Sequence, residues 1–367
     1  MGDSAIQSRQ HLSSVQFLRA LAATAVVAFH VQKDLMDRLS SGLPVNLDAG
    51  AAGVDLFFVI SGFVMVHSSE LLFGQTNAPA TFMLRRIVRI VPLYWLMTSV
   101  MLVYVVARGF AQSDASPALA LASYFFVPYL RPSGEFGPLY GIGWTLNFEM
   151  FFYLVFAVAL MAPRATWVVA IVATSLAVLT LIGRFTTYLP FPIAYLADPI
   201  VLEFVYGMIL ATIFRTGLRL SQSAATILLI AALLEFAWLN IAWFDSASSS
   251  AAFNLPRWIT YGVPAAQTVA ALTLLDRKLA FPHFEKLGDA SYALYLVHPA
   301  MIALARAVAM RGAIDPVAAP WLYFLGLVTL CIGAALLVHR WLEKPMTQGL
   351  KWRLDAWQHG TPRILSR

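Results

Sequence analysis

Long apolar segments separated by short polar ones dominate this chain and constrain its fold. We place ten of them, at residues 15–33, 52–72, 88–107, 143–162, 166–184, 195–215, 223–243, 258–276, 290–311 and 320–341. About 20 apolar residues are enough to cross a bilayer as a helix, which satisfies its own backbone hydrogen bonds in lipid. Charged residues make up 12% of the 367 residues, against about 25% in soluble domains. The sequence therefore predicts an all-α fold, a polytopic membrane helical bundle with about ten transmembrane helices.

The distribution of basic residues predicts how this bundle is oriented. With both termini cytoplasmic, most of the 25 Lys and Arg residues fall in cytoplasmic segments, as the positive-inside rule requires. A further apolar piece, 117–130, is too short to span comfortably and is expected to be interfacial or re-entrant. Counting it as a span would place the basic C-terminal segment outside. Residues 1–367 are expected to form a single integral-membrane domain that ends in a short basic cytoplasmic tail, 346–367.

Composition excludes several classes of function. The net charge of +6 is explained by basic cytoplasmic loops, so no nucleic-acid partner is expected. The single cysteine, Cys331, lies inside an apolar segment, which excludes a disulfide framework and a cysteine metal site. We expect no metal site.

The first apolar segment carries two ionisable residues, Arg19 and His30. Their spacing corresponds to about 1100° of helical rotation and about 16 Å of rise, so both lie on one face near opposite ends of the span. A charge inside a membrane helix costs on the order of 2.5–3.5 kcal/mol and usually faces a bundle interior or a wet cavity. The structural alternative is that Arg19 snorkels to one interface and His30 is capped at the other.

Two carboxylates are expected to face the same interior. Asp55 lies near the outer end of the second segment, at the level of His30. A pair between them would fix the imidazole tautomer and raise its basicity. Glu149 lies about 10 Å deep in the fourth segment, so it is either a neutral acid or the partner of a charge on another helix. Ser61, followed by a glycine, either belongs to the site or simply allows two helices to approach closely.

Two further groups of polar residues are candidates for the site. The arginines 85, 86 and 89 gather at the cytoplasmic start of the third segment, where they satisfy the positive-inside rule and also suit phosphate oxygens. Ser291, Tyr295 and His298 fall at i, i+4 and i+7, which is one stripe of the ninth segment. A polar stripe in a membrane helix faces protein or water rather than lipid.

Six pieces of the sequence, in order, resemble the membrane acyltransferase family often called acyltransferase 3. They are FLRALAATAVVAFH, GVDLFFVISGFVM, RRIVRIVPLYW, WTLNFEMFFYLVF, GDASYALYLVH and a closing EKP, which we interpret as a helix stop. They extend from residue 15 to residue 345 and so cover nearly the whole chain. The segment YGVPAA at 261–266 makes the chain look most like the exopolysaccharide and O-antigen acetyltransferases of that family.

The resemblance implies an enzyme, an O-acyltransferase of the bacterial inner membrane. Its members move an acyl group, usually acetyl, from cytoplasmic acyl-CoA to a sugar hydroxyl of an exported glycan or lipid-linked saccharide. Acetyl-CoA is thus expected as the donor substrate, with no bound cofactor, and membrane lipid and separate glycan-assembly proteins as partners. The resemblance implies that Arg19 and His30 are essential, that Arg86 and Arg89, with Arg85 beside them, serve the donor, and that Glu149 is a functional carboxyl.

His30 is the expected centre of the chemistry, either as general base on the sugar hydroxyl or as a nucleophile that forms an acyl-imidazole. Asp55 or Glu149 would orient it, and Tyr295 or Arg19 would stabilise the developing oxyanion. The competing hypothesis is a transporter or flippase of lipid-linked glycans, in which the buried charges form a substrate path or a proton relay. The absence of internal repeat symmetry and the inner arginine cluster argue against a transporter.

Overall fold

The computed structural model describes residues 2–40, 43, 45–131, 133–186, 188–245, 255–276, 280–312 and 315–359. Within these ranges the regular structure is helical, and β-type pairing is limited to two isolated bridges. Eight helical segments are long and apolar enough to cross a membrane, and they are Ser13–Leu39, Asp48–Ser68, Ala78–Arg108, Gly141–Ala159, Ala165–Phe185, Gln222–Leu239, Ser291–Ala309 and Pro320–Arg353. The predicted polytopic helical bundle is confirmed.

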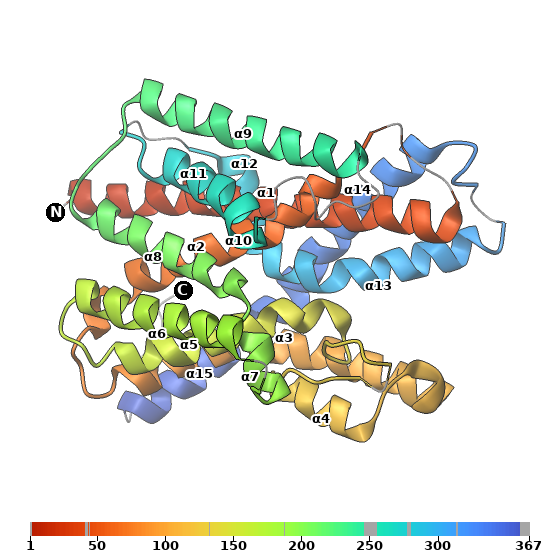
Figure 1. Cartoon of the computed structure of the whole chain (residues 1–367), viewed down its shortest axis with the longest axis horizontal. Coiled ribbons are helices and arrows are strands. Elements are labelled where there is room, and N and C mark those ends of the chain that lie inside the picture. Colours follow the sequence, from red (N-terminus) through yellow and green to blue (C-terminus); the bar gives the residue numbers. More distant parts are fainter. Residues whose placement is uncertain are drawn as a thin grey trace.

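Figure 1 shows the helices in chain order. They are α1 (Gly2–Leu39), α2 (Gly53–Ser68), α3 (Ala78–Arg108), α4 (Pro117–Tyr124), α5 (Trp144–Ala159), α6 (Ala165–Phe185), α7 (Phe191–Leu196), α8 (Leu202–Arg215), α9 (Gln222–Asp245), α10 (Arg257–Thr260), α11 (Gly262–Thr273), α12 (Pro282–Asp289), α13 (Ser291–Ala309), α14 (Pro320–Val338) and α15 (Lys344–His359).

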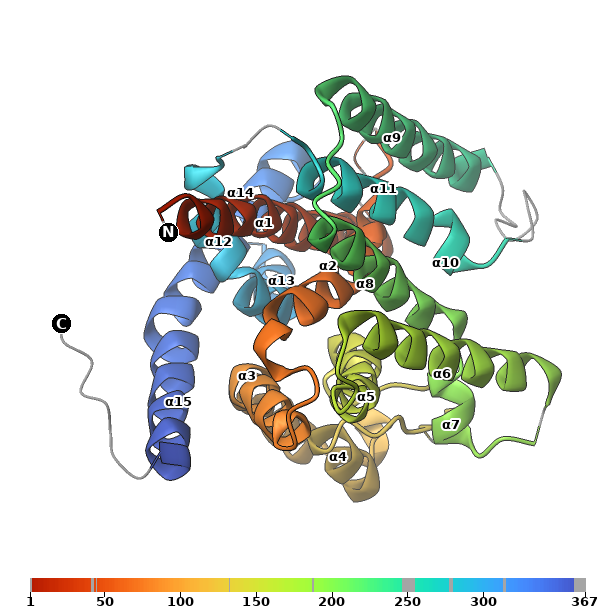
Figure 2. The ribbon, with the colours of Figure 1, turned by 90° about the vertical axis from the view of Figure 1, so that its left-hand side faces the viewer.

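The helices α2 and α8 lie at the centre of the bundle, with α1 and α9 to α14 on one side and α3 to α7 on the other (Figure 2). Fully buried aromatic rings join the centre to α5. Phe204 stacks on Phe152 with ring centroids 4.2 Å apart and also contacts Phe58, with centroids 4.6 Å apart. This aromatic cluster fixes α2, α5 and α8 against one another, and the candidate site is built around them.

Glycine allows α2 and α8 to touch backbone to backbone. A Cβ atom on Gly62 would lie 2.0 Å from the Phe204 carbonyl oxygen, and one on Gly207 would lie 1.8 Å from the Val59 carbonyl oxygen. Neither position can hold a side chain unless the helices separate. The close approach predicted around Ser61 is therefore confirmed, and it is Gly62 that permits it.

Two of the ten predicted spans are interrupted in the structure. The segment 195–215 passes from α7 through a short turn at Pro199–Val201 into α8, which has 14 residues. The segment 258–276 is divided at Tyr261 between α10 and α11, which has 12 residues. The first interruption follows from the sequence, because Pro199 cannot continue a helix and Asp198 instead caps the turn through the Ile200 N–H at 2.9 Å.

The apolar piece 117–130 forms α4, a helix of only 8 residues. Ser116 caps its start by accepting a hydrogen bond from the Leu119 N–H at 3.1 Å, and the helix ends before Phe126, whose φ of 58° is incompatible with a right-handed helix. Eight residues rise about 12 Å, which is too short to cross a bilayer. Its placement as interfacial or re-entrant stays a prediction.

The predicted helix stop at the closing EKP is wrong. The chain continues from α14 through a π-helical turn, His339–Glu343, directly into α15. Pro345 has no N–H to donate to the preceding turn, and the wider π turn just before it absorbs the missing hydrogen bond. Within the predicted tail 346–367, residues up to 359 are thus helical, and 360–367 lie outside the described residues.

Replacing Gly207 with alanine is expected to lower stability, because the new methyl group meets the α2 backbone. Overpacking a core costs about 1–3 kcal/mol, so the Tm of the detergent-solubilised protein should fall clearly. Gly333→Ala is the matched control, since a Cβ there meets nothing within 4 Å. Equal Tm values for the two variants would contradict the close contact between α2 and α8.

Candidate active site

Two adjoining cavities lie inside the bundle. The smaller, which we call the arginine cavity, has a volume of about 100 Å³. Its polar lining comes from α1, α2, α3, α5 and α13 and consists of Arg19, Ser61, Arg86, Arg89, Thr145, Glu149, Tyr153, Ser291, Tyr292 and Tyr295. Most of the residues predicted for the site are thus brought together here from five helices.

The larger cavity, which we call the histidine cavity, has a volume of about 830 Å³. His30, Arg257 and Arg306 line it, together with the aromatic residues Phe29, Tyr104, Tyr140, Trp144 and Tyr295. Val54 and Tyr295 line both cavities, so the two spaces meet at these side chains. A third recess of about 290 Å³ shares His30 and Arg306 and also contains His298.

Two arginines of α3 face the arginine cavity and one does not. Arg86 and Arg89 line it, whereas Arg85 is exposed and lies outside the lining. The cavity therefore brings together Arg86 and Arg89 without Arg85, and the donor-binding role of Arg85 stays a prediction. Arg86 lies over the rings of Phe82 and Tyr153, 5.3 Å and 5.9 Å from their centroids.

Glu149 belongs to the arginine cavity and is held there by hydroxyl groups. Its Oε1 accepts hydrogen bonds from Ser61 Oγ at 3.1 Å and from the Tyr153 hydroxyl. Ser61 is therefore part of the site. His30 lines the other cavity, so Glu149 is not placed to orient its imidazole.

The tautomer of His30 is set by a backbone carbonyl. Nδ1–H donates to the Val26 carbonyl oxygen at 2.9 Å, which leaves the lone pair on Nε2. His298 repeats the pattern with Leu294 at 3.1 Å, and its fully buried Nε2 has no hydrogen-bond partner in the part of the chain that the structure describes. The two imidazole rings lie 5.0 Å apart between centroids. His30 therefore presents an unprotonated nitrogen, as a base or a nucleophile must.

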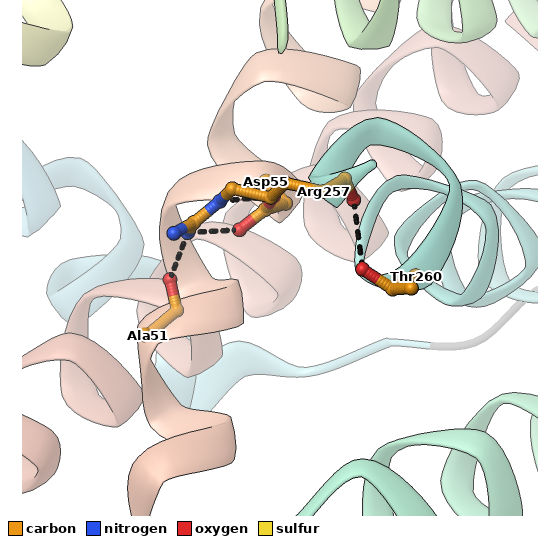
Figure 3. A network of polar contacts seen from close by, with 4 residues as sticks. All are labelled: Ala51, Asp55, Arg257 and Thr260. Atoms are coloured by element: carbon orange, nitrogen blue, oxygen red, sulfur yellow. Dashed lines mark hydrogen bonds and ion pairs between the residues drawn. The ribbon is translucent and has the colours of Figure 1, made fainter. Parts of the chain in front are cut away.

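The predicted pair between Asp55 and His30 is wrong. Figure 3 shows the Asp55 carboxylate beside the guanidinium of Arg257. Nε donates to Oδ1 at 3.0 Å and Nη2 donates to Oδ2 at 2.7 Å, while Nη2 also donates to the Ala51 carbonyl oxygen at 3.2 Å. Because Asp55 is fully buried, its carboxylate is stabilised better by an ion pair with the Arg257 guanidinium than by a hydrogen bond to a neutral imidazole.

Arg257 was not predicted as a site residue. In the sequence it appears as a loop charge just before an apolar segment. The only signal for it was Asp55 itself, because a carboxylate inside a span requires a cationic partner. Arg306 is a second missed residue, and it forms an ion pair with Asp34 of α1.

The polar stripe of α13 divides between the cavities. Ser291 and Tyr295 line the arginine cavity, and His298 lines the third recess. The Tyr295 hydroxyl donates to the Ile142 carbonyl oxygen at 3.2 Å and lies 2.9 Å from Thr145 Oγ1. The buried Ser291 Oγ lines the cavity and has no hydrogen-bond partner among the described residues. The described residues contain no group of three or more side chains able to hold a metal ion.

Comparison with known families finds one match that covers most of the chain. The model described as "Acyltransferase domain" matches residues 12–340. The chain is 35% identical over 301 residues to the exopolysaccharide production protein ExoZ of Rhizobium meliloti (strain 1021), which covers 81% of this chain and 89% of that protein.

Two further relatives are more distant. Nodulation protein 10 of Rhizobium leguminosarum bv. viciae is 26% identical over 81% of this chain and 85% of its own length. The peptidoglycan O-acetyltransferase OatA of Listeria monocytogenes is 29% identical over 40% of this chain and 24% of its own length. No solved structure matches the chain significantly.

Breaking the Asp55–Arg257 pair is expected to destabilise the protein. Removing one partner of a buried ion pair costs about 3–5 kcal/mol, although Arg257 is partly exposed and the loss will lie toward the lower end. Arg257→Met should lower the Tm of the detergent-solubilised protein, and Asp55→Asn combined with Arg257→Gln should restore part of the loss. Arg311→Met is the control, because Arg311 is exposed and lines neither cavity. An unchanged Tm for Arg257→Met would contradict this role of the pair.

Proposed function

The chain belongs to the acyltransferase family and is a membrane O-acyltransferase, and from this premise we propose that it transfers acetyl from cytoplasmic acetyl-CoA to a hydroxyl of an exported saccharide. The observation that carries the proposal is that the arginines and His30 line two cavities that meet at Tyr295 and Val54. The names of relatives, which refer to exopolysaccharide production and peptidoglycan O-acetylation, support a saccharide acceptor. We place the enzyme in the bacterial inner membrane, beside separate glycan-assembly proteins.

The arginine cavity suits the donor. The phosphates of acyl-CoA carry several negative charges and cannot enter hydrocarbon unpaired, and Arg86 and Arg89, which line this cavity, would bind them. Arg19 lines the same cavity from α1. A volume of about 100 Å³ is well below the roughly 300–1,000 Å³ of pockets that enclose whole ligands. The cavity would therefore accept only a slender part of the donor, the phosphates at the arginines and the arm that carries the thioester, while the nucleoside stays outside.

The histidine cavity suits the acceptor. Its volume of about 830 Å³ is within the range that encloses small organic ligands. Its aromatic side chains offer flat apolar surfaces for the faces of sugar rings, and His30 lies in its wall. The acceptor hydroxyl would approach Nε2 of His30 from this side while the thioester arrives from the arginine cavity.

The transfer can proceed by two routes. In the direct route, Nε2 of His30 takes the proton of the sugar hydroxyl, the oxygen bonds to the thioester carbon, and the carbon–sulfur bond breaks to release CoA. In the covalent route, Nε2 attacks the thioester first and the acyl-imidazole then passes its acyl group to the sugar. In both routes the developing oxyanion needs a hydrogen-bond donor, and Tyr295 is the candidate because it lines both cavities, whereas Ser291 lines only the arginine cavity.

Incubation with radiolabelled acetyl-CoA tests the role of His30. His30→Ala should abolish transfer to acceptor, because the neighbouring imidazole, His298, is fully buried and does not line the histidine cavity. Label retained on the wild-type protein and lost in His30→Ala would establish the acyl-imidazole, whereas transfer without labelled protein would establish the direct route. A His30→Ala protein that inserts normally and still acetylates the acceptor would refute the mechanism.

The neighbouring arginines of α3 provide a matched pair for the donor site. Arg89→Ala should raise the KM for acetyl-CoA about tenfold or more, since charge-assisted hydrogen bonds contribute about 1.5–3 kcal/mol each. Arg85→Ala, which removes an equal charge from the exposed face, should leave the KM within about twofold. Steady-state kinetics with both variants checks this, and equal effects would show that only the general positive charge matters.

A further inference from the structure

The histidine cavity has a one-sided charge pattern. Arg257 and Arg306 line it, and none of the described residues that line it is an aspartate or glutamate. The carboxylates that neutralise the two arginines lie elsewhere. Asp55 is fully buried behind Arg257, and Asp34 faces the third recess. A molecule inside the histidine cavity therefore meets guanidinium groups and no carboxylate of the described lining.

Arg257 is fixed in place before any ligand arrives. Asp55 and the Ala51 carbonyl occupy its Nε and Nη2, as Figure 3 shows, and the ring of Tyr261 lies 5.3 Å from its guanidinium carbon. These contacts use only part of the five N–H donors of a guanidinium. The side chain lines the histidine cavity and is 38% exposed while its partner Asp55 is 0% exposed, and the N–H groups of Nη1 take no part in these contacts.

Arg306 offers a second cation from a different helix. It lies on α13, its Nη1 donates to Asp34, and its side chain is 31% exposed. A guanidinium that served only to neutralise a buried carboxylate would not need an exposed part that lines a cavity of this size. Two partly exposed guanidinium groups in one cavity, one from α10 and one from α13, match a ligand that carries negative charge.

Resting on the acyl transfer proposed above, we propose that the acceptor is an anionic saccharide, whose carboxylate or phosphate group is bound by Arg257 and Arg306 in the histidine cavity. The aromatic residues would contact the sugar rings, and the anionic group would set which hydroxyl reaches His30. A neutral saccharide in the same cavity would strip water from two guanidinium groups without replacing it by a charged acceptor. The cavity should therefore discriminate against neutral saccharides at the level of binding.

The experiment uses the extracellular polysaccharide of host cells that lack this protein. One portion is left untreated, one has its carboxyl groups reduced to alcohols, and one is dephosphorylated with hydrofluoric acid. The KM and kcat for acetyl transfer to each are measured with the full-length protein in nanodiscs. We expect one treatment to raise the KM about tenfold or more, as loss of a charge-assisted hydrogen bond predicts, and the treatment that does so identifies the anionic group as carboxylate or phosphate.

Equal KM values for all three portions would overturn the inference while leaving the acyltransferase proposal intact. If none of the portions is acetylated, the proposed function itself fails, and the inference fails with it. Because acetylation of the polysaccharide is measured directly, the two failures are distinguishable.

Two variants separate recognition from a purely structural role. Arg306→Gln and Arg257→Lys, the second of which keeps a cation beside Asp55, should each raise the KM for the untreated polysaccharide severalfold and leave the KM for the neutralised one unchanged. Arg311→Gln removes an exposed arginine that lines neither cavity and should change neither. An equal rise in KM for charged and neutralised polysaccharide would show that the arginines only support the fold, and would overturn the proposal.

Discussion

An ionisable side chain inside a membrane bundle needs a partner or a polar cavity, and this requirement organises the structure. Asp55, fully buried at the start of α2, is neutralised by Arg257, which is 202 residues away in the chain. Asp34 of α1 is paired in the same way with Arg306 of α13. The two pairs tie the first two helices to α10 and α13, and the histidine cavity opens where they do so. The two ion pairs thus hold these helices together and also position the arginines to which the acceptor is proposed to bind.

In the proposed reaction, the two cavities hold the donor and the acceptor on either side of shared lining residues. The glycine contact between α2 and α8 and the aromatic stack on α5 hold the centre of the bundle rigid. Around this centre, the arginine cavity gathers Arg19, Arg86 and Arg89, and the histidine cavity gathers His30 and the aromatic residues. Tyr295 lies at the junction, so only the thioester end of a donor has to reach it. Under the proposed function, a polyanionic donor and a bulky saccharide would then meet without either crossing the membrane.

The sequence predicted the parts of this arrangement that depend on a single helix. Hydropathy predicted the bundle, and helical spacing placed Arg19 and His30 on one face of α1, where each lines a cavity. The sequence did not predict which helices contact one another. Asp55 was assigned to His30 because the two lie at one level, but level in the membrane does not say which helices are neighbours. The place of Arg85 outside the cavity was missed for a related reason, since the rotation of α3 about its axis decides which arginines face inward. The π turn before Pro345 was missed because proline usually ends a helix.

Sidedness tests the central claim most directly, because the account places donor and acceptor on opposite sides of the membrane. Purified protein would be reconstituted in sealed vesicles with radiolabelled acetyl-CoA trapped inside and acceptor polysaccharide only outside. The account predicts labelled polysaccharide in the external medium, and none with His30→Ala. Acetylation that occurs only when donor and acceptor are supplied on the same side would contradict the path from the arginine cavity to the histidine cavity.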